Sequence, residues 1–216
     1  MAYVANICSI PAEPGALAWQ GSLLLSGERV GHDPAFAAAR RDDLGAGAWV
    51  EHVAGWLTGA DDLCARLVTE LPWESHTVGM YGRIVVEPRL TQFRVHDHLD
   101  RFAEVAILGA ALSARYEHDL ARVGAALYRD GADSVAWHGD RVDPSVADPI
   151  VAIVSLGAPR RLLLRPTTGG PSRSVTLCGG DLFVMGGTCQ RTWQHCVPKT
   201  RRAIGPRVSL MFRDAP

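Results

Sequence analysis

The sequence lacks the features that mark membrane-spanning, secreted and disulfide-stabilised proteins. Its 216 residues contain no apolar run of 18 residues, so no transmembrane helix and no membrane partner are expected. The first residues carry no basic region, and Pro11 and Pro14 follow soon after, which argues against a secretory signal. Five cysteines are an odd number without a Cys-x-x-Cys pair, which indicates neither a disulfide framework nor a zinc knuckle. We therefore expect a cytoplasmic protein with reduced thiols.

Lysine is almost absent, because Lys199 stands alone beside 21 arginines. The net charge of −1 hides an uneven distribution, since residues 157–213 contain ten basic side chains and a single acid, Asp181. A basic half of this kind is what a protein that binds a phosphate backbone presents. An arginine-rich solvated surface produces the same pattern, and composition alone leaves both readings open.

Short apolar segments separated by glycine and proline dominate the second half of the chain. Strands are expected at residues 150–156, 161–165 and 181–185, and an earlier one at 47–53. Such a meander fits a double-sheet jelly roll, in which late strands return to early ones. Since 47% of the residues are hydrophobic, the chain can bury one sizeable core.

Two helices are expected before these strands. Residues 58–71 and 97–116 carry apolar side chains at helical spacing, and Asp97 is a suitable N-cap for the second helix. The fold class we predict is an all-β core with flanking helices.

A candidate metal site is formed by His138, Asp140 and His195. Residues two apart on a strand point to the same side, so His138 and Asp140 can face one ion while Gly139 points away. Two imidazoles and one carboxylate make a facial triad, which leaves three positions of an octahedral Fe(II) open. A single histidine is more often a structural residue, and it is the combination of the three that favours a metal.

Two arginines near the end of the chain could hold a dicarboxylate beside this metal. Arg207 and Arg213 are six positions apart, an even number, so both can face inward from one strand. Two arginines that fence an exposed edge strand explain the spacing equally well.

Six segments, in order, resemble one family: residues 127–131, His138 to Asp140, 155–157, 180–187, 195–199, and the closing Arg207 and Arg213. They are similar to AlkB-type Fe(II)/2-oxoglutarate dioxygenases, which oxidatively remove alkyl lesions from nucleic-acid bases. The resemblance covers roughly residues 44–213 and is densest after Tyr128. It implies a double-stranded β-helix in a single domain of residues 44–216, preceded by an N-terminal extension of residues 1–43. Within the domain, helices and a recognition lid are expected in residues 44–120 and the jelly-roll catalytic core in residues 121–213.

The resemblance also assigns roles to single residues. His138, Asp140 and His195 would bind iron and carry the catalysis. Tyr128 and Arg207 would hold the distal carboxylate of 2-oxoglutarate, Arg213 the carboxylate next to the keto group, and Ser209 would join them in the co-substrate site. Ala126 stands where the family usually has asparagine, so one hydrogen bond to the co-substrate is expected to be missing.

The implied function is demethylation of N-alkylated bases in DNA or RNA, a DNA-damage repair activity that uses Fe(II), 2-oxoglutarate and O2. The expected partner is a single strand with a flipped alkylated base, bound by a monomer. Tyr81 and Arg83 in the lid, with Arg161 and Arg165, are the candidate substrate-binding residues. Val142 replaces a carboxylate of the best-known members. A hydroxylase or demethylase of RNA, protein or a small molecule, or a silent nucleic-acid-binding relative, are the alternatives.

Overall fold

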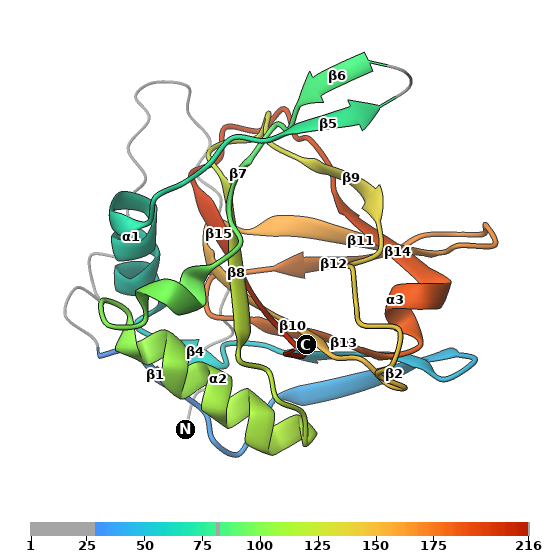
Figure 1. Cartoon of the computed structure of the whole chain (residues 1–216), viewed down its shortest axis with the longest axis horizontal. Coiled ribbons are helices and arrows are strands. Elements are labelled where there is room, and N and C mark those ends of the chain that lie inside the picture. Colours follow the sequence, from blue (N-terminus) through green and yellow to red (C-terminus); the bar gives the residue numbers. More distant parts are fainter. Residues whose placement is uncertain (1–28, 81–82, 216) are drawn as a thin grey trace, which may run out of the picture.

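The computed structural model describes residues 29–80 and 83–215. Within them, an antiparallel seven-stranded sheet has the order β2-β3-β13-β10-β15-β8-β7 (Figure 1). Its strands are β2 Ala39–Gly45, β3 Ala48–Val53, β13 Leu182–Gly187, β10 Val151–Gly157, β15 Arg207–Arg213, β8 Arg122–Tyr128 and β7 Leu90–Gln92. The strands predicted at 47–53, 150–156 and 181–185 are confirmed as β3, β10 and β13.

A four-stranded sheet with the order β12-β11-β14-β9 lies over one face of the seven-stranded sheet (Figure 1). Its strands are β12 Arg173–Leu177, β11 Arg160–Pro166, β14 Trp193–Val197 and β9 Val135–His138. An inner apolar cluster joins the two sheets, for example through Ile153 and Phe183 of the large sheet and Leu162 and Leu164 of the small one. The two facing sheets are the jelly roll that the sequence predicted.

Helices cover the opposite face of the large sheet. The helices are α1 Ala60–Glu70 and α2 Ala103–Tyr116, and an outer apolar cluster packs them against the sheet. The helix predicted at 97–116 begins later than expected, because Asp97 lies in the separate 3-10 helix η1 Val95–His98, where it pairs with Arg94 at 2.7 Å. A short helix, α3 Cys189–Thr192, precedes β14. None of the helices in these described ranges is both long and apolar enough to cross a membrane.

Strict alternation decides which side chains reach the interior between the sheets. On β15, Val208, Leu210 and Phe212 belong to the outer cluster beneath the helices. Met211 belongs to the inner cluster, and Arg207 and Ser209 share its parity. The even spacing of Arg207 and Arg213 therefore places both on the inner face, as predicted.

The structured body begins before residue 44. Strand β1 Gly31–His32 pairs with β4 Leu57–Thr58, and β2 pairs with β3, so the domain start expected at residue 44 falls inside β2. At the other end of the body, β5 Thr77–Met80 and β6 Arg83–Val86 form a hairpin that projects outward (Figure 1). The hairpin exposes Ile84 and Val86.

Candidate metal and co-substrate site

The structure brings His138, Asp140 and His195 together. His138 ends β9 and is the direct cross-strand partner of His195 on β14, and their ring centroids are 4.3 Å apart. One ligand atom from each of the three residues lies within 4.8 Å of the other two. A divalent ion of the first transition row can be bound by all three at ordinary distances of about 2.0–2.3 Å with small side-chain movements.

Asp140 is fixed from two sides. Its Oδ1 accepts a hydrogen bond from Arg213 Nη2 at 2.7 Å, and its backbone N–H donates to Gln190 Oε1 at 2.8 Å. Its Oδ2 is buried without a hydrogen-bond partner among the described residues and lies 3.7 Å from His195 Nε2. Gly139 is required here, since a Cβ would lie 2.7 Å from the Gln190 carbonyl oxygen. Arg213 thus occupies one carboxylate oxygen and leaves the other for a metal.

The electrostatics of the site prepare both groups for metal binding. Burial opposes the charged form of Asp140, but Arg213 and His195 outweigh it and hold the pKa of this carboxyl well below its ordinary value. Burial lowers the pKa of His195 to about 4, although Asp140 acts in the opposite direction. At neutral pH the carboxylate is therefore ionised and the imidazole neutral, which are the forms that a metal needs.

Arg207 is a buried cation on the inner face of β15, directly across from Tyr128. Only 2% of Arg207 is exposed, its Nε donates to Ser155 Oγ at 3.1 Å, and its guanidinium lies 5.4 Å from the centre of the Tyr128 ring. Burial lowers its pKa to about 10, so it remains charged at neutral pH. Its Nη1 has no hydrogen-bond partner in the described chain. A buried cation without an anion is costly, so this position fits a ligand carboxylate.

Several buried polar side-chain atoms of the described residues lack a hydrogen bond. Among the described residues, the buried side-chain atoms without a hydrogen bond include Thr91 Oγ1, Arg89 Nε, Asp140 Oδ2 and Arg207 Nη1. Native proteins leave few such atoms, and each needs an explanation. Two imidazoles, one carboxylate and buried cations fit Fe(II) together with a small dicarboxylate such as 2-oxoglutarate.

Two further residues of the site were not anticipated. Arg89 Nη1 donates to the Tyr128 hydroxyl at 3.2 Å. Burial opposes the charge of Arg89, but Tyr128, Glu87 and Asp140 outweigh it and keep the Arg89 pKa above its ordinary value. Gln190 holds Asp140 from α3. Neither belongs to a motif, and only the fold brings them to the metal residues.

The candidate substrate residues lie in three different places. Tyr81 lies outside the described residues, and Arg83 opens β6 opposite Met80. Arg161 is exposed on β11 and donates to Ser174 Oγ at 3.1 Å.

Arg165 is four residues after Arg161 on β11 and therefore lies on the same outer face of the strand. It stacks on Trp137 at 4.2 Å and contacts Gln194 Oε1 at 3.1 Å. Arg165 therefore braces the residues that precede His138 and His195. Arg160, counted with the basic half, is buried and donates to backbone carbonyls, including that of Asp133 at 2.7 Å, so it adds no surface charge.

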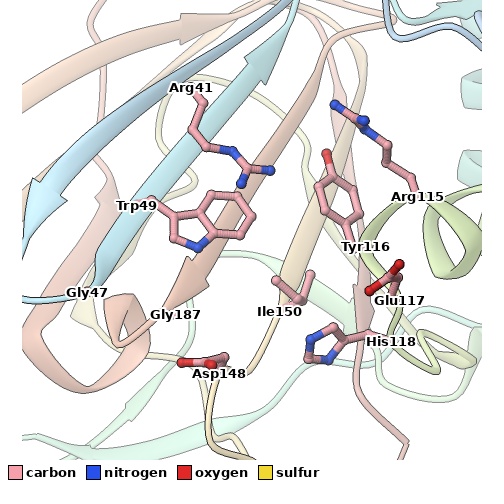
Figure 2. Close-up of a pocket in the computed structure, with 10 residues that line it drawn as sticks. All are labelled: Arg41, Gly47, Trp49, Arg115, Tyr116, Glu117, His118, Asp148, Ile150 and Gly187. Atoms are coloured by element: carbon pink, nitrogen blue, oxygen red, sulfur yellow. The ribbon is translucent and has the colours of Figure 1, made fainter.

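A separate pocket of about 350 Å³ lies on the helix side of the large sheet, and no residue of the metal triad lines it (Figure 2). Trp49 and Tyr116 lie with ring centroids 6.2 Å apart, and Arg41 covers Trp49 at 3.8 Å. The buried Glu51 carboxylate accepts hydrogen bonds from the Tyr116 hydroxyl at 2.6 Å and from Arg41 Nε at 2.9 Å. These polar groups satisfy one another and link α2 to β2 and β3.

Comparison with known proteins agrees with this geometry. Residues 96–213 match the family model of the 2OG-Fe(II) oxygenase superfamily. The chain is 29% identical to the alpha-ketoglutarate-dependent dioxygenase alkB homolog 3 of Bos taurus, over 73% of this chain and 62% of that protein. It is 30% identical to the DNA oxidative demethylase ALKBH2 of Arabidopsis thaliana, over 66% of this chain and 58% of that protein.

The fold has a solved counterpart. The non-heme alpha ketoglutarate dependent epimerase SnoN from nogalamycin biosynthesis matches 76% of each chain with a TM-score of 0.54 and 18% sequence identity, which shows a shared fold. The chain spans about half to three fifths of the length of curated relatives such as the alkB homolog 3 proteins. The family match, the metal triad and these relatives together show that the chain belongs to the 2OG-Fe(II) oxygenase superfamily and to its AlkB-type members.

Proposed function

We propose that the protein is an Fe(II)/2-oxoglutarate-dependent dioxygenase that removes methyl groups from alkylated bases of single-stranded DNA or RNA. The observation that carries the proposal is the pairing of a metal triad with a buried cation. His138, Asp140 and His195 offer ligand atoms from the small sheet and the segment that follows β9. Arg207, whose Nη1 has no hydrogen-bond partner among the described residues, offers a carboxylate site from β15 of the facing sheet. Curated relatives include proteins named as DNA oxidative demethylases.

Each residue of the site has a physical task. His138 and His195 present imidazole nitrogens from adjacent strands, and Arg213 holds Asp140 so that Oδ2 remains available. Arg207 and Tyr128 would bind the distal carboxylate of 2-oxoglutarate. Iron, when bound, couples the oxidation of 2-oxoglutarate by O2, to succinate and CO2, to hydroxylation of the substrate methyl group. The hydroxymethyl amine then collapses to an aldehyde and the repaired base.

Basic side chains support a nucleic-acid substrate. Arg161 lies exposed on the outer face of the small sheet, and Lys199 and Arg201 follow β14 in the next loop. These charges support contacts with a phosphate backbone, and the proposal includes a flipped base that enters the site.

Val142 favours a second candidate function. It lies two residues beyond Asp140 and packs against the inner apolar cluster. An apolar side chain at this place accepts no hydrogen bond from the exocyclic amine of a base. A 2-oxoglutarate-dependent hydroxylase of protein or a small molecule is therefore the alternative.

A substrate panel tests the proposal. The purified protein would be incubated with Fe(II), 2-oxoglutarate and O2, together with oligonucleotides of DNA and RNA that carry 1-methyladenine or 3-methylcytosine, and with methylated peptides. We expect methyl loss from the oligonucleotides, and none from an Asp140→Ala control. Succinate formation without methyl loss would support the hydroxylase. Binding of oligonucleotides without succinate formation would indicate a silent relative.

A further inference from the structure

We propose that Thr91 donates a hydrogen bond to the distal carboxylate of 2-oxoglutarate and is a co-substrate-binding residue. The inference rests on the proposed function, because it assigns another residue to the same site. Neither the sequence motifs nor the metal triad point to Thr91, which lies on β7 at the edge of the large sheet.

The alternation of β7 turns Thr91 into the interior. Leu90 packs against the outer apolar cluster, and Gln92 Nε2 donates to the Pro72 carbonyl at 2.9 Å. Thr91, between them, points to the other face. It is the direct cross-strand partner of Ala126, which belongs to the inner cluster.

The hydroxyl of Thr91 has no hydrogen-bond partner in the part of the chain that the structure describes. Thr91 is 1% exposed, and its Oγ1 is buried without a hydrogen bond among the described residues. The backbone groups of Thr91 are satisfied, because its N–H and C=O both pair with Glu74 at 2.9 Å. Burial of an unsatisfied hydroxyl costs free energy, so its retention indicates that a ligand accepts the bond.

The neighbours of Thr91 identify the ligand. Ala126 lies between Thr91 and Ser209 in one row across β7, β8 and β15, and the next row is formed by Tyr128 and Arg207. Successive rows on one face are about 7 Å apart and adjacent strands about 4.8 Å apart, so the Cα atoms of Thr91 and Arg207, one row and two strands apart, are separated by about 12 Å. The length of the arginine side chain lets its guanidinium and the Thr91 hydroxyl contact one carboxylate. The side chain of Ala126 is a single methyl group, so it leaves room on the inner face of the sheet for a ligand that contacts Thr91 and Ser209 on either side.

The test is a pair of substitutions at one position. Thr91→Val keeps the shape and removes the hydroxyl, whereas Thr91→Ser keeps the hydroxyl. Binding of 2-oxoglutarate would be measured by calorimetry on the full chain with Mn(II) in place of iron, so that no turnover occurs. We expect Thr91→Val to raise the Kd for 2-oxoglutarate about tenfold or more and Thr91→Ser to leave it within about twofold. Equal affinities of Thr91→Val and the wild type would overturn the assignment.

Two controls separate the possible failures. If the wild-type protein with Mn(II) bound no 2-oxoglutarate, the proposed function itself would fail, and with it the assignment. Denaturant unfolding of the ligand-free variants provides the second control. An unpartnered hydroxyl predicts that Thr91→Val is at least as stable as the wild type. A clear loss of stability would show that the hydroxyl has a partner within the protein, and would contradict the proposal.

Discussion

Replacement of Arg207 by methionine should change ligand affinity and protein stability in opposite directions. Arg207 is 2% exposed and donates one intramolecular side-chain hydrogen bond, to Ser155, while Nη1 has no partner among the described residues. Such a group is poorly explained as a stabilising element, because a buried charge without an anion is unfavourable. It is well explained as a carboxylate receptor.

The magnitudes follow from these contacts. Each lost hydrogen bond to a charged group costs about 1.5–3 kcal/mol. Loss of two hydrogen bonds from the guanidinium to the carboxylate should therefore raise the 2-oxoglutarate Kd by at least about a hundredfold. In the ligand-free protein, an apolar side chain of similar length removes the desolvated charge and leaves Ser155 without a donor. Removal of the desolvated charge should stabilise the protein by about 1–4 kcal/mol, and loss of the hydrogen bond to Ser155 should destabilise it by about 1 kcal/mol. The variant should therefore be as stable as the wild type or more stable.

Calorimetric titration of 2-oxoglutarate with Mn(II) and denaturant unfolding without ligand measure the two effects. Arg207→Lys is the matched control, because it retains the charge and loses the bidentate geometry, and its affinity should lie between those of the wild type and Arg207→Met. A large loss of stability with unchanged 2-oxoglutarate binding would show that Arg207 is a structural residue and not a carboxylate receptor.

Three further outcomes are expected. Burial lowers the pKa of His195 to about 4 from an ordinary 6.5, so as the pH falls the unfolded chain takes up a proton at this residue before the folded chain does. The free energy of unfolding of the metal-free protein should therefore fall by up to about 3 kcal/mol between pH 6.5 and pH 4. The variant His195→Gln should show a smaller dependence of stability on pH in this range. Gly139→Ala should weaken Mn(II) binding and cost about 1–3 kcal/mol of stability, because its Cβ would meet the Gln190 carbonyl; normal metal affinity in titration would contradict this. Replacement of Arg161 by alanine should flatten the salt dependence of single-strand binding, by about 0.7 in the log-log slope for each lost phosphate contact, while 2-oxoglutarate affinity stays unchanged.

The parts of the site that alternate along a strand were predictable from the sequence. The even spacing of Arg207 and Arg213 placed both on the inner face. The three metal residues followed from the His-x-Asp pair, a distant histidine and the family resemblance, and Asp140 lies just beyond the end of β9 rather than on the strand. The first inference needs only the period of a strand, whereas the metal set also needed the order of motifs that the family shares.

Contributions that depend on which strands become neighbours could not be predicted. Thr91 and Arg89 reach the site because β7 pairs with β8, an edge pairing that joins segments about 35 residues apart. Gln190 reaches Asp140 from a one-turn helix. The start of α2 was misplaced because Asp97, a good N-cap residue by type, pairs with Arg94 in the preceding 3-10 helix.

The most direct test of the account is the stoichiometry of the reaction on a single-stranded oligonucleotide that carries 3-methylcytosine. Formaldehyde, succinate and unmodified cytosine would be quantified together with Fe(II), 2-oxoglutarate and O2 supplied. We expect about one formaldehyde and one cytosine for each succinate formed, and none of the three from a His138→Ala variant. Succinate formed at the same rate with and without the oligonucleotide, with the methyl group intact, would contradict it.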